Sequence, residues 1–198
     1  AFRREGDGFN GEASQHSNPR PSRFLTPLGD DLMPPESPGS EQRQTSVGLA
    51  MKIEDIFTGP PPQGFLGEGL RFRTNRGELN GILHRAPEAT QGVVWVCGAR
   101  GGFGGPGPGI YEYMAEEFVG RNITSLRLDY RLPNELNECA LDLLTGGAGL
   151  KGLGCGPVLV VGHSFGGAVV IAAAAASQHI SGVVSLSPQT YGANGAPH

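Results

Sequence analysis

From residue 70 to residue 186 the sequence alternates between short apolar runs and longer stretches with helical spacing. Residues 70–74 alternate apolar and polar side chains, which is typical of a half-buried strand. A turn and a second run at 79–84 follow, so these two segments predict a hairpin. Four more apolar runs have the length of buried strands; they cover residues 92–97, 123–128, 158–161 and 181–186.

The stretches between these strands predict helices. Residues 110–120 repeat apolar side chains at helical spacing and end near Gly120, a common helix terminator. Residues 134–146 place leucines on one side, and the alanine-rich run up to Ala176 is a strong helix former. Strands separated by helices imply a parallel sheet with right-handed crossovers. The predicted fold class is therefore α/β, with a mostly parallel sheet and helices on both faces.

A Gly-x-Ser-x-Gly motif lies between the strand at 158–161 and the alanine-rich helix. A serine hydroxyl is a poor nucleophile unless it is exposed and has a base and an oxyanion site. A sharp strand-to-helix turn would expose Ser164 in a strained conformation, and flanking glycines would allow close backbone approach. The Phe165 N–H, at the helix N-terminus, is the first expected oxyanion donor. A chance glycine-serine turn is the alternative, and the strand and helix around it argue against that.

This succession resembles the α/β-hydrolase superfamily from Leu70 to the C-terminus. Its motif, Gly162 to Gly167, is similar to that of small serine esterases, dienelactone hydrolases and acyl-peptidases. The resemblance implies a serine hydrolase that acts on a small-molecule acyl substrate of the carboxylic ester type, with no cofactor. In that family the loop after the third strand supplies the second oxyanion donor. Here this loop begins at Gly98 rather than with the family's His-Gly-x-Gly, and Ala99 is the expected donor.

The same resemblance implies an acid and a histidine after the serine in chain order. Only six of the family's eight strands are found, and twelve residues follow the last of them. We therefore expect the acid and the histidine beyond the present C-terminus, in a chain whose last strands are missing. The last strand present would then be an unprotected edge of a parallel sheet, and such an edge favours pairing with other chains.

Substitutes for these two residues within the chain are not convincing. Asp129 ends a strand, where a loop- or helix-capping role is the more common one. His163 is expected to point away from the serine hydroxyl, and His84 is expected at the surface. His179 is expected on the far side of the molecule, and His198 is the last residue.

The composition limits the possible partners, location and cysteine chemistry of the protein. The net charge of −4 provides no basic field for nucleic acid. Apolar runs fall short of the roughly 18 residues needed to span a bilayer, and no signal-peptide core is seen, so a cytoplasmic protein is expected. Three widely spaced cysteines fit neither a disulfide framework nor a zinc pattern. Cys97 and Cys155 are expected to be small apolar fillers. The sequence does not identify protein partners.

The first fifty residues are rich in Pro, Ser, Gly and charged residues and show no helix or strand period. Such a segment buries too little apolar surface to offset its ordering entropy. The predicted organisation is a disordered tail over 1–50, a linker over 51–69 and the α/β-hydrolase-like domain over 70–198.

Two other functions remain open. Gly102, Gly104 and Gly107 follow a strand in a Gly-x-Gly-x-x-Gly pattern, and Asp129 lies 22 residues later, as in a dinucleotide-binding Rossmann-like domain. Against this, Pro106 and Pro108 keep the chain in a loop where the helix should open, and Gly102 comes five residues after Cys97. The third possibility is a non-catalytic protein that keeps the α/β-hydrolase fold.

Overall fold

The computed structural model describes residues 50–190. The predictions for the tail over 1–49 and for His198 lie outside the described residues.

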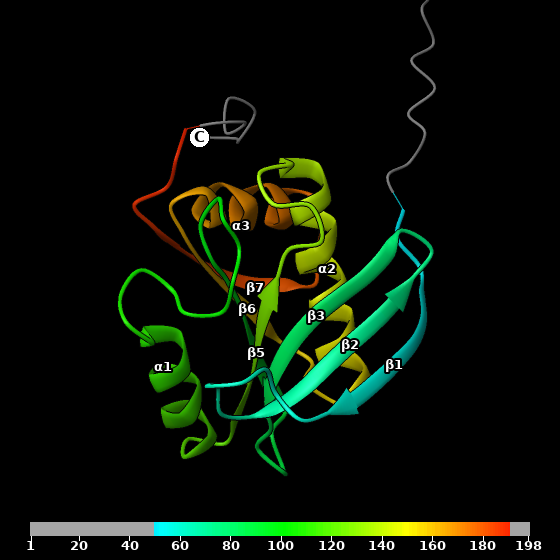
Figure 1. Ribbon diagram of the computed structural model, residues 1–198, viewed down its shortest axis with the longest axis vertical. Coiled ribbons are helices and arrows are strands. Elements are labelled where there is room, and N and C mark those ends of the chain that lie inside the picture. The colour runs from blue at the N-terminus through cyan, green and yellow to red at the C-terminus, as the bar shows by residue number, and fades with distance from the viewer. Residues whose placement is uncertain (1–49, 191–198) are drawn as a thin grey trace, which may run out of the picture. The chain divides into compact units, whose positions relative to one another are not determined.

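Seven strands form one sheet with the order β1-β2-β3-β5-β4-β6-β7 (Figure 1). Strands β1, β2, β3 and β5 are joined by antiparallel pairing, and β5, β4, β6 and β7 run parallel to one another. All six predicted strands are present, and their bounds are β2 Glu68–Thr74, β3 Gly77–His84, β4 Gln91–Val96, β5 Ile123–Asp129, β6 Val158–His163 and β7 Ile180–Leu186.

The seventh strand, β1 (Ile53–Gly59), lies in the segment 51–69 that the sequence predicted to be a linker. It pairs antiparallel with β2, so for residues 53–59 that prediction is wrong. A register shift between Ile53 and Asp55 interrupts the pairing, and most side chains of β1 are exposed. An irregular edge strand of this kind lacks the period of two that identifies a strand in sequence.

The three helices of residues 50–190 cover the two faces of the sheet, as predicted (Figure 1). Helix α1 (Ile110–Val119) packs against Trp95 and Val93 on one face, around a smaller apolar cluster. Helices α2 (Leu136–Gly152) and α3 (Phe165–Ala175) pack on the other face, around the larger core. Within residues 50–190, no helix is long and apolar enough to cross a membrane.

Helix α2 begins two residues later and ends six residues later than the sequence predicted. Its extension passes through Gly146 and Gly149, which are poor helix formers. A Cβ at Gly149 would lie 2.6 Å from the Phe72 ring, and one at Gly146 would overlap Leu128. These glycines let α2 lie close against the sheet, so packing overrides local propensity here.

Candidate active site

Ser164 lies alone between the end of β6 and the start of α3. Its backbone angles are φ 57° and ψ −119°, a conformation that costs a non-glycine residue of order 1–3 kcal/mol. The Ser164 N–H donates to the Leu186 carbonyl at 2.9 Å, and its own carbonyl accepts from the N–H groups of Gly167 and Gln189 at 3.0 and 3.1 Å. Neighbouring backbone therefore holds the strained turn in place.

Close backbone approach around this turn requires glycine at two positions. A Cβ at Gly162 would overlap the Gly166 carbonyl. A Cβ at Gly166 would lie 2.8 Å from the Val96 carbonyl oxygen and would overlap that of Cys97. The first turn of α3 thus lies directly on the end of β4, and this contact places Ser164 beside the loop that follows β4.

We expect Gly166→Ala to lower the free energy of unfolding by about 2–3 kcal/mol, because its methyl group would push two packed backbone segments apart. Gly152→Ala is the matched control, since a Cβ there meets nothing within 4 Å at the end of α2. That control should be neutral or stabilise by up to about 1 kcal/mol. Urea unfolding of both variants measures the difference, and equal stabilities would contradict the close approach.

The loop after β4 begins beside the serine. An ideal Cβ on Gly98 would lie 4.0 Å from the Ser164 Oγ. Ala99 follows, half-buried against the core, and within residues 50–190 no backbone carbonyl accepts its N–H. Phe165 is the first residue of α3, where an N–H has no acceptor within its own helix. The two residues that the sequence offered as oxyanion donors thus belong to the two segments that meet at Ser164.

Asp129, at the end of β5, fixes the next part of this loop. Its Oδ1 accepts the Gly102 N–H at 2.6 Å, and both Gly101 (φ 69°) and Gly102 (φ 87°) adopt the left-handed backbone that favours glycine. The Gly101 N–H also closes a turn onto the Gly98 carbonyl at 3.0 Å. The loop-capping role that the sequence favoured for Asp129 is therefore confirmed.

Two tyrosines on opposite faces of the sheet donate hydrogen bonds to the last carbonyl of β4 and to the carbonyl that follows it. The Tyr130 hydroxyl donates to the Cys97 carbonyl at 3.0 Å, and the Tyr111 hydroxyl donates to that of Val96 at 3.3 Å. The Tyr130 ring also packs edge-on against Phe165, with 6.0 Å between centroids. Sequence reasoning did not single out either tyrosine, although both rings support the segments around Ser164.

The side-chain partner of the serine is Gln189, whose Nε2 donates to the Ser164 Oγ at 3.2 Å. An amide N–H donates and does not take up a proton, so Gln189 is no general base. The sequence analysis did not name this residue. Its position after β7 was the available signal, because the carboxyl ends of parallel strands meet at one edge of a sheet.

The described histidines do not replace Gln189 as the partner of the hydroxyl. His163 is half-buried and makes no side-chain hydrogen bond within residues 50–190. His179 is exposed and precedes β7, while Ser164 lies beyond the opposite end of that strand, about 20 Å away at 3.3 Å per residue. His84 is 2% exposed, so the prediction of a surface histidine is wrong.

His84 belongs to a buried polar cluster with Arg127, Glu112 and Glu116. Arg127 Nε donates to His84 Nε2 at 3.1 Å, and its Nη2 donates to Glu112 Oε2 at 2.9 Å. His84 Nδ1 contacts the Glu116 carboxylate on the same helix α1. Burial lowers the pKa of both His84 and Arg127. Burial raises the pKa of Glu112, but hydrogen bonds from the Leu66 N–H and from Arg127 outweigh it and lower that pKa.

This cluster also holds the far half of the glycine-rich loop. Arg127 Nη1 donates to the Phe103 carbonyl at 3.4 Å, and its Nη2 donates to the Leu66 carbonyl at 3.0 Å. The Phe65 and Phe103 rings pack edge-on with 5.6 Å between centroids. The guanidinium thus ties α1, two loops and the sheet together.

The buried His84 predicts that the protein is less stable in acid. Its folded pKa lies below the unfolded value near 6.5, so the unfolded chain takes up the proton first as pH falls. Stability should therefore decline as pH drops below about 6.5. Urea unfolding between pH 7.5 and pH 5.5 should show a flatter decline for His84→Gln than for the exposed control His179→Gln. Equal slopes in the two variants would rule out His84 as the cause.

The thiols of this region are ordinary buried groups. Burial raises the pKa of Cys97, and it raises the pKa of Cys139 to about 12, which keeps both protonated near neutral pH. All three cysteines are buried and unpaired in the described part of the chain, so Cys97 and Cys155 are the apolar fillers that the sequence predicted. Between residues 50 and 190, no group of three His, Cys, Asp or Glu side chains could hold a metal ion.

The glycine pattern of the dinucleotide-binding alternative lies on the same loop. Gly107 precedes the start of α1 by three residues, and the helix opens only after Gly109. Asp129, which that alternative assigns to a ribose hydroxyl, uses one carboxylate oxygen on Gly102. Asp129 therefore holds the loop in place. The third glycine of the pattern does not open the helix as the Rossmann pattern requires.

Comparison with known proteins identifies the fold. No protein-family model matches the sequence, and no curated protein matches it. Solved structures do match, at 19–23% identity. The α/β hydrolase GrgF from Penicillium sp. has a TM-score of 0.51 and 22% identity, over 61% of this chain and 45% of that one. An esterase from Pyrococcus furiosus has a TM-score of 0.50 and 19% identity, over 64% and 53%.

Est1E from Butyrivibrio proteoclasticus matches with a TM-score of 0.50 and 23% identity, over 61% of this chain and 50% of that one. The chain thus spans about half the length of the solved structures that it matches. Their strand-and-helix arrangement agrees with the one predicted from the sequence and observed here. The chain therefore has the α/β-hydrolase fold.

Proposed function

We propose that this chain carries the nucleophile and the oxyanion site of a serine hydrolase that cleaves carboxylic esters. The observation that carries the proposal is the conformation of Ser164, at φ 57° and ψ −119° between β6 and α3. Strain of this size at one serine, at the carboxyl edge of an α/β sheet, is typical of a functional residue. The loop that starts at Gly98 lies beside its hydroxyl.

In this mechanism the Ser164 Oγ attacks the carbonyl carbon of the ester and gives its proton to a base. The carbonyl oxygen becomes an oxyanion, which the N–H groups of Phe165 and Ala99 stabilise. The tetrahedral intermediate then collapses, and the base returns the proton to the departing alcohol. Water attacks the acyl-serine in the same way and releases the acid. Loss of one oxyanion donor typically costs about a hundred- to a thousandfold in rate.

The base in this proposal is a histidine outside residues 50–190. Among the described residues, His84 is buried on Arg127, His179 lies at the opposite edge of the sheet, and His163 makes no contact with the hydroxyl. In this proposal the base takes the place of Gln189, whose Nε2 lies 3.2 Å from the Ser164 Oγ. The triad acid belongs with that histidine.

A fluorophosphonate probe tests the proposal, since it modifies activated serines. We expect the intact protein to carry one adduct, located by mass spectrometry on Ser164. Labelling should fall as pH drops through the range in which a histidine base is protonated. No adduct on the intact protein, or one on another serine, would favour the non-catalytic alternative.

A further inference from the structure

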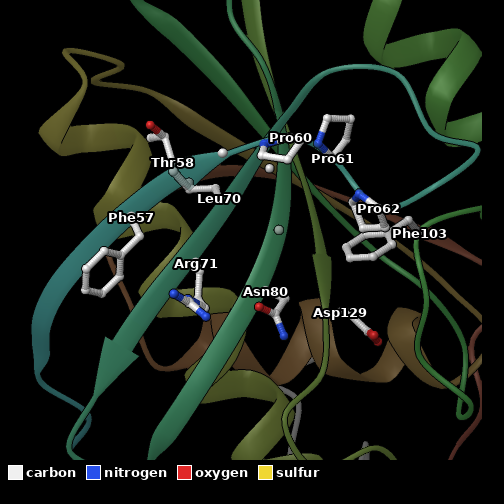
Figure 2. A pocket seen from close by; sticks show the side chains of 13 residues that line it. Phe57, Thr58, Pro60, Pro61, Pro62, Leu70, Arg71, Asn80, Phe103 and Asp129 are labelled. Atoms are coloured by element: carbon white, nitrogen blue, oxygen red, sulfur yellow. The ribbon is translucent and has the colours of Figure 1, made fainter.

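A hollow of about 560 Å³ lies over the strands β1, β2, β3 and β5, on the face of the sheet that carries α1. Figure 2 shows the side chains of Phe57, Arg71, Asn80 and Asp129 in a row across these strands, with Pro60 to Pro62 and Phe103 around them. The hollow takes no part in the ester chemistry proposed above, so its polar lining needs another explanation.

The register of the strands explains both the row and the empty space. Phe57 pairs with Arg71, Arg71 pairs with Asn80, and Asn80 pairs with Asp129. Directly paired residues point to the same face of a sheet. Two residues further along, the row consists of Gly59, Gly69, Ile82 and Arg127, so its positions on β1 and β2 have no side chains. The chain then crosses above it, since a Cβ on Gly69 would overlap the Pro60 carbonyl.

The row offers hydrogen-bond donors and acceptors in alternation. Arg71 donates, the Asn80 amide donates and accepts, and the Asp129 carboxylate accepts. Neighbouring strands lie about 4.8 Å apart, so these three groups extend over roughly 10 Å. Within residues 50–190, the Asn80 side chain has no hydrogen-bond partner, and only Oδ1 of Asp129 is engaged. Arg71 makes one loose ion pair, 3.7 Å from Glu78, and its guanidinium lies 5.2 Å from the centroid of the Phe57 ring.

We propose that this hollow binds a neutral saccharide. Each hydroxyl of a sugar both donates and accepts, so neighbouring hydroxyls match a row of guanidinium, amide and carboxylate groups. One positive and one negative charge face the hollow, which disfavours a ligand with a net charge. The Phe103 ring and the prolines provide apolar walls for the C–H faces of a sugar ring.

The hollow also lies on the same side of the molecule as the serine. Asp129 ends β5, and β4 and β6 follow in the sheet, so Ser164 is two strand spacings away, about 10 Å. A saccharide in the hollow could therefore carry the ester that Ser164 attacks. This link rests on the proposed function, whereas the binding of the saccharide does not.

Titration calorimetry with the neutral disaccharides cellobiose, maltose and xylobiose tests the site, with the Ser164→Ala protein to prevent turnover. We expect saturable binding of at least one of them. Asn80→Ala and Arg71→Met should each weaken it about five- to tenfold, as expected for the loss of roughly 1 kcal/mol of hydrogen bonding. Arg85→Met is the matched control, because Arg85 is exposed, follows the end of β3 and does not line the hollow, so binding should be unchanged.

Three results would overturn the saccharide site. They are no binding of any disaccharide, binding that both variants leave unchanged, and tighter binding of the charged sugar glucuronic acid than of its neutral counterpart. If disaccharides bind but the intact protein takes no fluorophosphonate adduct, the saccharide site stands and its link to an ester fails. If the adduct forms and no disaccharide binds, the hydrolase stands and the saccharide site fails.

Discussion

Under the proposed function, exchange of Ser164 for alanine is expected to lower ester hydrolysis by the intact protein on the order of ten-thousandfold or more, which is the usual consequence of losing a serine nucleophile. The reason is that, among residues 50–190, no other hydroxyl or thiol lies at this turn. Ser164 occupies the strained turn between β6 and α3, and the loop from Gly98 lies beside its hydroxyl. The release of p-nitrophenol from p-nitrophenyl acetate measures the change.

Ser177→Ala is the matched control for this prediction. Ser177 follows α3 at the other edge of the sheet, where its hydroxyl accepts the His179 N–H at 3.3 Å. Its loss should leave the rate within a factor of two of the wild-type rate, because Ser177 is only half-buried and lies far from Ser164. If Ser164→Ala retained the wild-type rate, hydrolysis would have to occur elsewhere in the protein.

Exchange of Arg127 for methionine is expected to lower the free energy of unfolding by about 3–5 kcal/mol. The guanidinium is fully buried, and its loss leaves Glu112 without its cation and His84 Nε2 without its donor. The carbonyls of Phe103 and Leu66 lose their donors as well. A buried acceptor left without a partner carries the full cost of its desolvation.

Arg73→Met is the control, since the same substitution then removes a guanidinium that is about half exposed. Arg73 makes surface ion pairs with Asp55 at 3.1 Å and Glu54 at 3.9 Å, and its guanidinium lies 5.3 Å from the centroid of the Phe57 ring. Exposed contacts of this kind contribute about 0–1 kcal/mol each. Urea unfolding of the two variants at neutral pH makes the comparison. Equal losses would mean that the Arg127 cluster stabilises the fold no more than a surface ion pair.

The sequence predicted the elements of the core because each has a clear period or composition. The strand β6 is a run of valine and leucine, and α3 is rich in alanine. β1 was missed because its register shift and its exposed side chains remove the period of two, and the prolines that follow suggest a linker. The length of α2 was underestimated because glycine is judged by its propensity, while Gly146 and Gly149 are used for packing.

The position of Ser164 in a turn between a strand and a helix was predicted, because chemistry and spacing coincide there. Arg127 stands between two leucines and suggests a polar outer face of a strand. Its burial depends on Glu112 and on the Leu66 segment, which are distant in sequence. His84 was predicted at the surface because it ends the hairpin strand. Gln189 became visible only when the sheet placed the end of β7 beside the end of β6.

The strand order has a consequence for folding during synthesis. β3 and β4 are consecutive in the chain, yet each pairs with β5 and not with the other. As the chain leaves the ribosome, the β1–β2–β3 meander can form early, but β4 has no partner until Ile123–Asp129 has emerged. The apolar β4, with Val94 and Val96 fully buried in the final fold, is then exposed as an unpaired nascent strand. The arrival of β5 is therefore the step that joins the two halves of the sheet, and a translational pause shortly before it would prolong the aggregation-prone state.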